Sequence, residues 1–103
     1  MVSEYQRRRD AALLVLRKPG GPRVVNPDGA FYLYIDVQDT NPGSEDAGSA
    51  FAARLLEEHG VAVVPGAAFR TNGWIRLSYA AALEAVVEGV TRIVKLREEM
   101  RHR

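Results

Sequence analysis

Two stretches of the chain alternate between apolar and polar residues, a pattern typical of a strand with one buried face. In Ala30–Val37, one face carries Phe31, Leu33, Ile35 and Val37. In Trp74–Tyr79, one face carries Ile75, Leu77 and Tyr79. Shorter strands are predicted at Arg23–Val25 and at Ala62–Val64, the second buried and ended by a Pro-Gly pair. A tight turn at Asn26–Gly29 joins the first two strands into an antiparallel hairpin.

Three segments with helical spacing flank and separate these strands. The first, from about Glu4 to Leu16, begins with Ser3 as N-cap and Gln6 as its capping-box partner. The second begins at its predicted cap Ser44 and ends at Gly60. Its apolar stripe consists of Phe51, Ala52, Leu55 and Leu56. The third runs roughly over Ala82–Arg101, and its apolar stripe consists of Leu83, Val86, Val87, Val90, Ile93 and Val94. The charged end, Arg97–Arg103, is predicted to fray.

This order of elements predicts an α+β fold in one domain over residues 1–103. We expect a small mixed or antiparallel sheet of three to four strands with the helices packed on one face. The other face then carries the residues that alternate with the buried ones, namely Tyr32, Tyr34, Trp74 and Arg76. Three aromatic side chains on an open face indicate a docking surface.

Composition excludes several classes of function. The formal net charge is +1, which gives no broad electrostatic case for binding nucleic acid or a membrane surface. The chain has no cysteine, which excludes disulfides, thiol nucleophiles and cysteine metal ligands. Its two histidines, His59 and His102, are far apart and lack the carboxylate pattern of a metal site. The apolar runs are too short for a membrane span and no signal peptide is evident, so we expect a cytoplasmic protein.

Most polar candidates are better explained by structure than by catalysis. The run Arg7–Arg9 is typical of a solvated helix face, and Asp36 is typical of a cross-strand partner. Ser78 has no histidine in a context that suggests a catalytic triad, and His59 suits the negative end of a helix. None of these residues indicates a nucleophile or a general base.

Arg76 is different, because it lies near the middle of a predicted strand on the face opposite Ile75 and Leu77. An arginine in this position either points into water or binds an anion. A guanidinium can donate two parallel N–H bonds to a carboxylate, which fixes orientation as well as supplying charge. The pattern alone leaves a surface or cross-strand ion pair as the commoner alternative.

Several motifs in the same order resemble the C-terminal segment of fold type I pyridoxal-phosphate (PLP) aminotransferases, and the prokaryotic aspartate aminotransferase branch most. They are YQRRRD at 5–10, NPDGAFYLYIDV at 26–37, LLEEHGVAVVPG at 55–66, GWIRLSYA at 73–80 and LEAVVEGVTRI at 83–93. No single motif is decisive, but their order and gaps match over nearly the whole chain.

The resemblance implies that the chain is the small C-terminal domain of an aminotransferase acting on an amino acid and a 2-oxo acid. It implies that Arg76 binds the α-carboxylate of the substrate and that the full-length protein is a homodimer with PLP. The PLP-binding large domain is absent from this chain. Lys18, in a Pro-Gly turn, and Lys95, in the last helix, lack the context of a Schiff-base lysine. We therefore expect the 103 residues to contain no catalytic residue, no metal site and no PLP-binding residue, and to be inactive alone.

The sequence departs from the family pattern at two further points. Arg70 follows Phe69 where a small residue, often glycine, is common, and Ala80–Ala82 offer no side-chain cap to the last helix. Arg70 keeps an alternative open, in which the chain is a stand-alone, non-catalytic interaction or regulatory module derived from the small domain. The sequence does not identify the side chain of the substrate.

Overall fold

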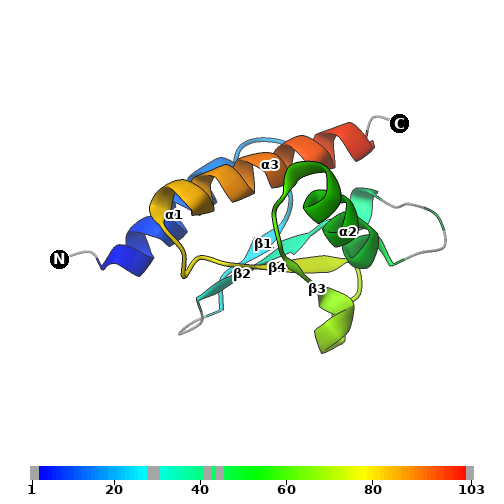
Figure 1. Cartoon of the computed structure of the whole chain (residues 1–103), viewed down its shortest axis with the longest axis horizontal. Coiled ribbons are helices and arrows are strands. Elements are labelled where there is room, and N and C mark those ends of the chain that lie inside the picture. The colour runs from blue at the N-terminus through cyan, green and yellow to red at the C-terminus, as the bar shows by residue number, and fades with distance from the viewer. Residues whose placement is uncertain (1–2, 28–30, 41–42, 44–45, 102–103) are drawn as a thin grey trace.

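Three helices cover one face of a four-stranded sheet in the computed structural model, and the short helix η2 (lime green) projects on the other side (Figure 1). The structure describes residues 3–27, 31–40, 43 and 46–101. The helices and strands in chain order are α1 (Glu4–Leu16), β1 (Val24–Val25), β2 (Tyr32–Asp36), α2 (Ala47–His59), β3 (Val64–Pro65), β4 (Trp74–Ser78) and α3 (Leu83–Arg101). Two short 3-10 helices, η1 (Gln38–Thr40) and η2 (Gly66–Phe69), follow β2 and β3.

The sheet has the order β1-β2-β4-β3, and each pair of neighbouring strands is antiparallel. The two five-residue strands β2 and β4 form its centre, with Tyr34 opposite Arg76 and Ile35 opposite Ile75. The edge strands β1 and β3 have only two residues each. The predicted α+β fold is confirmed, with an antiparallel sheet of four strands.

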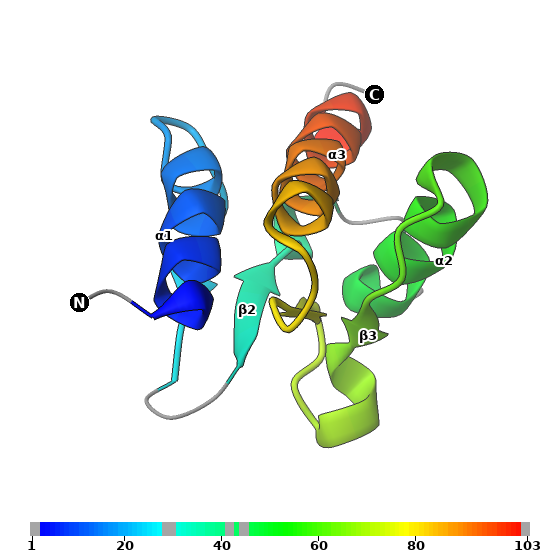
Figure 2. The same ribbon diagram turned by 60° about the vertical axis from the view of Figure 1, so that its left-hand side comes forward.

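The core lies between this sheet and the helices. Figure 2 shows α3 between α1 and α2, with all three above the sheet. The largest fully buried side chains are Leu16, Leu33, Ile35, Val37, Phe51, Leu55, Ile75, Val90, Ile93 and Leu96. Apart from Leu16 and Leu96, they come from the apolar faces predicted for the two long strands and for the second and third helices. Apolar burial is the main term that holds these layers together.

The ends of α1 and α2 are set by local hydrogen bonds. Ser3 and Gln6 form the predicted capping box, in which each side chain accepts from the backbone N–H of the other residue. Gly60 ends α2 in the left-handed region, as glycine does readily. The N-cap of α2 is Asp46 rather than Ser44, which lies outside the described residues.

Leu56 is 58% exposed and does not belong to the buried stripe of α2, so that part of the prediction is wrong. The buried residues of this helix are Ala47, Gly48, Phe51, Ala52 and Leu55. Because α2 covers the edge of the sheet near β3 and β4, it buries only a narrow stripe of side chains. A residue one position beyond that stripe points to water.

The predicted short strands shift in the structure. The second one lies at Val64–Pro65 and is half-buried, whereas Ala62 is exposed, so the buried strand predicted at 62–64 is wrong. Proline is tolerated there because β3 is an edge strand with one unpaired side. Phe31 is 47% exposed and precedes β2, with its ring against Tyr5 and Tyr79. The predicted turn 26–29 lies partly outside the described residues.

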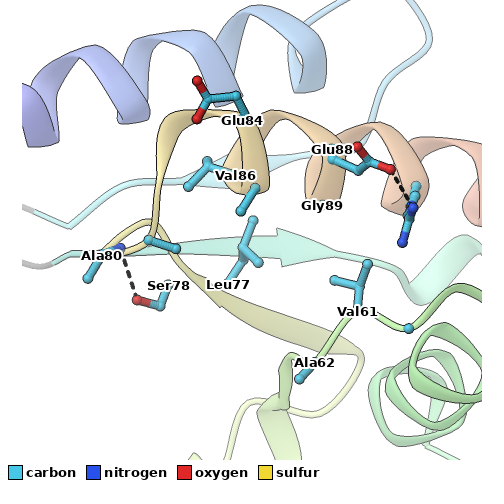
Figure 3. A pocket seen from close by; sticks show the side chains of 13 residues that line it. Val61, Ala62, Leu77, Ser78, Ala80, Glu84, Val86, Glu88 and Gly89 are labelled. Carbon is cyan, nitrogen blue, oxygen red and sulfur yellow. Dashed lines mark hydrogen bonds and ion pairs between the residues drawn. The ribbon is translucent and has the colours of Figure 1, made fainter.

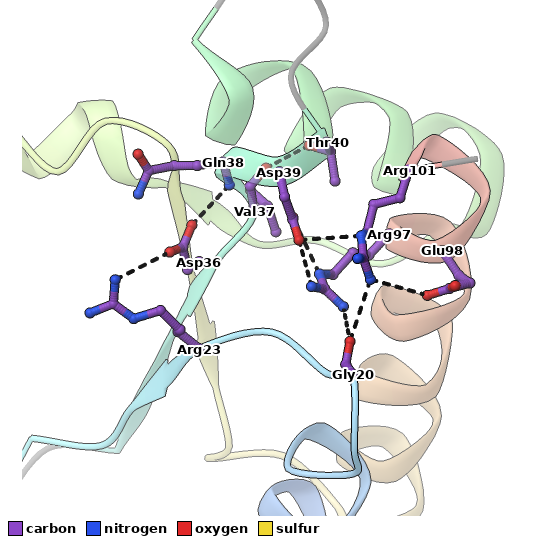
Figure 4. Close-up of polar contacts among 10 residues, drawn as sticks. All are labelled: Gly20, Arg23, Asp36, Val37, Gln38, Asp39, Thr40, Arg97, Glu98 and Arg101. Carbon is purple, nitrogen blue, oxygen red and sulfur yellow. Dashed lines mark hydrogen bonds and ion pairs between the residues drawn. The ribbon is translucent and has the colours of Figure 1, made fainter. Parts of the chain in front are cut away.

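The end of α3 is anchored rather than frayed up to Arg101, contrary to the prediction. Arg97 is buried, and it donates hydrogen bonds to the carboxylate of Asp39 and to the carbonyl of Gly20 (Figure 4). Leu96 and Met100 extend the buried stripe of the helix. This highly charged segment therefore contains both an ion pair with η1 and an apolar face that packs on the core. His102 lies outside the described residues.

Candidate functional site

Arg76 lies in the interior of the sheet, on the face opposite the helices. Its neighbours across the strands are Tyr34 on β2 and Val64 on β3. Ile75 and Leu77 are buried, whereas Arg76 is half-buried, so the predicted alternation of β4 is confirmed. The strand therefore presents a cation on a face that the three helices leave open.

Two aromatic rings hold the guanidinium of Arg76. Its Cζ atom lies 4.3 Å from the ring centre of Tyr32 and 5.0 Å from that of Phe69. A cation over a ring face is attracted by the ring quadrupole. Among the described residues, no hydrogen bond or ion pair joins the Arg76 side chain to a carboxylate. Its N–H donors therefore have no carboxylate acceptor among the described residues.

Phe69 also packs against the next aromatic residue of the face. Its ring meets that of Tyr34 edge to face, with 5.4 Å between the centres. Beside them lies an open hollow of about 490 Å³, whose lining residues are Val25, Pro27, Tyr34, Phe69, Thr71 and Trp74. The cation and a largely apolar hollow therefore share the same face of the sheet.

The turn that carries Phe69 has a fixed backbone. The N–H of Thr71 donates to the carbonyl of Gly66 over 2.7 Å, and a Cβ atom on Gly66 would lie 1.9 Å from the Thr71 carbonyl oxygen. Glycine is therefore required at this close approach. Arg70 closes the turn in the left-handed region with φ 64°, which is uncommon for a residue with a side chain.

Asp46 ties the end of this turn to the start of α2. Its carboxylate accepts from the backbone and hydroxyl of Ser49 and, over 2.7 Å, from the N–H of Gly73. Burial raises the pKa of Asp46, but the hydrogen bonds from Ser49 and Gly73 outweigh it and leave the pKa below its ordinary value of 3.8. The segment just before β4, and hence Arg76, is anchored by this carboxylate.

The other candidates have structural partners. Asp36 pairs with Arg23 across the strands at 3.9 Å, as predicted, and accepts from the N–H of Gln38 (Figure 4). Ser78 is exposed and accepts from the N–H of Ala80. The predicted cross-strand role of Asp36 is confirmed.

Sequence reasoning missed a group formed by Glu58, His59 and Glu99, whose ligand atoms lie within 4.8 Å of one another. It was not visible in the sequence because α2 and α3 bring it together. Arg54 donates to both carboxylate oxygens of Glu58, over 2.7 Å and 3.1 Å. Glu58 is thus already paired, and the group is explained as an ion-pair network.

A second hollow, of about 540 Å³, lies between the first turns of α3 and the segment that leads into β3 (Figure 3). Val61 and Ala62 face Val86 and Gly89 across it, and Glu84 and Glu88 lie at its rim. It does not include Arg76 or the rings around it. Such a hollow depends on how separate segments pack and is not predictable from spacing.

Within the described residues, the structure contains no helix with the length and apolar character needed to cross a membrane.

Residues 1–93 match the family model described as aminotransferase class I and II. The probable aspartate/prephenate aminotransferase of Aquifex aeolicus is 45% identical over 102 residues, covering 97% of this chain and 25% of that protein. The aspartate aminotransferase of Streptomyces avermitilis is 45% identical over 105 residues, covering 96% of this chain and 26% of that protein.

Solved structures show the same likeness. The aromatic aminotransferase of Pyrococcus horikoshii OT3 matches with a TM-score of 0.78 and 37% identity, over 93% of this chain and 25% of that one. An aspartate aminotransferase of Thermotoga maritima matches with a TM-score of 0.74 and 35% identity. The match covers 90% of this chain and 23% of that one. The chain thus spans about a quarter of the length of these proteins.

Proposed function

Since the chain belongs to the class I and II aminotransferase family, we propose that it is the C-terminal small domain of an aminotransferase and that its Arg76 binds the α-carboxylate of the substrate. The full-length protein then transfers an amino group between an amino acid and a 2-oxo acid. The observation that carries this proposal is the position of Arg76, on the open face of the sheet with no carboxylate partner among the described residues.

The geometry suits a carboxylate for a physical reason. A guanidinium offers two parallel N–H donors that match the two oxygens of a carboxylate, so binding fixes the direction of the substrate. The rings of Tyr32 and Phe69 attract the cation without consuming those in-plane donors. The partly buried setting strengthens the ion pair relative to water.

The family implies PLP in the full-length enzyme. The residues of this chain do not fit an attachment site for it. Lys18 is exposed in the turn after α1, and Lys95 is exposed on α3, across the sheet from Arg76. We therefore assign cofactor binding to a large domain outside this chain, and we propose that the whole enzyme is a homodimer.

We place that large domain against the open face of the sheet. Tyr32, Tyr34, Phe69 and Trp74 line this face, and the hollow beside Phe69 is largely apolar. Covering apolar surface is favourable by roughly 25 cal/mol per Å². Domain closure over this face would exclude water and bring Arg76 to the substrate.

The test is steady-state kinetics of the full-length protein with Arg76→Ala. Losing a charge-assisted bidentate contact costs about 2–5 kcal/mol when its partner stays desolvated. We expect kcat/KM for an amino acid to fall by roughly 30- to 5,000-fold, at about 1.36 kcal/mol per tenfold. The matching amine, which lacks the α-carboxylate, should lose far less. Arg76→Lys should restore kcat/KM for the amino acid only in part, because an ammonium keeps the charge but lacks the two parallel N–H donors of a guanidinium.

Arg23→Ala is the matched control, since Arg23 lies beside Trp74 on the same face and is paired with Asp36. It should leave the preference for the amino acid unchanged. Equal losses for amino acid and amine in Arg76→Ala, or a collapse of stability, would show that Arg76 is structural. A parent full-length protein without aminotransferase activity would favour the non-catalytic interaction module instead.

A further inference from the structure

Phe69 contacts Arg76 from a different segment of the fold. It ends η2, seven positions before Arg76 along the chain, whereas Arg76 lies in β4. Its ring centre lies 5.0 Å from the guanidinium carbon, and its edge-to-face contact with Tyr34 fixes it from the other side. The ring is thus supported by the strand next to Arg76.

Backbone contacts restrict where this ring can lie. The bond from Thr71 N–H to the Gly66 carbonyl closes the turn around Phe69, and the left-handed Arg70 directs the chain back toward β4. The Gly73 N–H then reaches Asp46 at the start of α2. A ring held in this way limits the number of positions open to the long, flexible side chain of Arg76.

Phe69 does not belong to the hydrophobic core. It is half-buried and lies outside the buried cluster between sheet and helices, on the opposite face of the sheet. The position of this partly exposed aromatic ring is therefore best explained by the residues that it contacts. Its described aromatic and cationic contacts are Tyr34 and Arg76.

We propose that Phe69 is a positioning residue, which holds the guanidinium of Arg76 in the orientation that receives the α-carboxylate. This inference rests on the carboxylate role proposed for Arg76. Pre-ordering a binding group lowers the entropy lost when the ligand arrives, so the ring raises affinity without touching the substrate. Tyr32 supplies the second ring, but it lies on β2 and its backbone also forms part of the central strand pair.

The experiment is Phe69→Leu in the full-length enzyme, compared with Phe69→Tyr. A cation–π contact of this kind predicts a loss of about 2- to 30-fold in kcat/KM for the amino acid, mainly through KM. The amine without a carboxylate should be unaffected, and Phe69→Tyr should restore the parent value because it keeps the ring. Phe31→Leu is the control, since Phe31 is also half-exposed but packs on Tyr5 and Tyr79.

A second readout does not depend on turnover. In protein labelled with ¹⁵Nε-arginine, the Arg76 resonance is assigned by its loss in Arg76→Lys. The nearby ring faces should shift its Nε–H proton upfield. Phe69→Leu should move it back, and Phe31→Leu should leave it in place. An unchanged resonance in Phe69→Leu would overturn the proposed contact. If that variant folds poorly, Phe69→Met gives the same comparison.

The outcomes separate the two proposals. If Arg76→Ala discriminates between amino acid and amine but Phe69→Leu does not, the positioning role is wrong and the carboxylate role stands. If Phe69→Leu penalises both substrates equally, Phe69 is structural. If Arg76→Ala itself fails to discriminate, the carboxylate role is wrong and the positioning role falls with it, even where the resonance shift shows the ring contact.

Discussion

The carboxylate of Asp39 and the guanidinium of Arg97 form a two-pronged ion pair although they lie 58 residues apart. Nη2 of Arg97 is 2.5 Å from Oδ2 of Asp39, and its Nη1 donates to the carbonyl of Gly20 over 2.9 Å. Arg101 adds a further contact to the same carboxylate. One buried arginine thus joins η1, α3 and the connection between α1 and β1 (Figure 4).

Asp39→Ala should destabilise the fold by about 1–3 kcal/mol, because it leaves the buried Arg97 charge without its partner. Arg97→Met should lower the free energy of unfolding by less than Asp39→Ala does, because it removes the buried charge and keeps an apolar side chain in its place. Denaturant unfolding of each variant measures these free energies. The double variant Asp39→Ala/Arg97→Met should be more stable than Asp39→Ala alone. Simple additivity of the two losses would contradict the pairing.

Asp46→Ala should destabilise the chain by about 1–2 kcal/mol at pH 7, because it removes the N-cap of α2. The contact to Gly73 is lost with it. The pKa of Asp46 is lowered in the folded state, so its contribution is complete above the unfolded pKa of about 4. This stabilising contribution of Asp46 is lost as the pH falls through the pKa that Asp46 has in the folded state. Urea unfolding at pH 7 and pH 3 should therefore show a difference between parent and variant that shrinks in acid. A constant difference would argue against an ionised cap.

Arg70→Gly should stabilise the fold by about 0.5–1 kcal/mol, since a side chain in the left-handed region is strained and glycine is not. Arg70→Ala should give no such gain, because alanine keeps the Cβ atom. The denaturation midpoint, followed by Trp74 fluorescence, measures both. Loss of stability in Arg70→Gly would mean that the arginine side chain makes contacts that outweigh the strain of its backbone.

The 103-residue chain should form no site-specific Schiff base with PLP, because Lys18 and Lys95 are exposed and remote from the open face. Titration with PLP, borohydride reduction and peptide mapping by mass spectrometry test this. Weak labelling spread over exposed amines is the expected background. A stoichiometric adduct at one of the two lysines would contradict the assignment of cofactor binding to a separate domain.

Spacing alone predicted the elements that have one buried face. The alternation of Ile75, Leu77 and Tyr79 identified the buried side of β4, and therefore placed Arg76 on the open side. The capping box of Ser3 and Gln6 marked the start of α1. These features depend on residues close in sequence, so local patterns contain the information.

The features that sequence reasoning missed depend on residues far apart. The last turns of α3 look solvated from their charges, yet Arg97 is buried because Asp39 lies across from it. Likewise, no pattern in the sequence places Phe69 beside Arg76, because that contact follows from the turn that folds Phe69 back onto β4. The spacing of residues along the chain contains no signal for a contact between residues 58 positions apart, so this contact is seen only in the folded structure.

The two-residue edge strands have a consequence for how the chain behaves in concentrated solution. Both five-residue strands are interior, and the edges of the sheet are formed by β1 and β3, which have two residues each. One edge contains Pro65, which has no N–H to donate, and the other is preceded by the exposed cation of Arg23. Templated growth of an amyloid-like ribbon needs a long, flat edge on which the next strand can form its ladder. The described fold offers neither side of its sheet for that purpose.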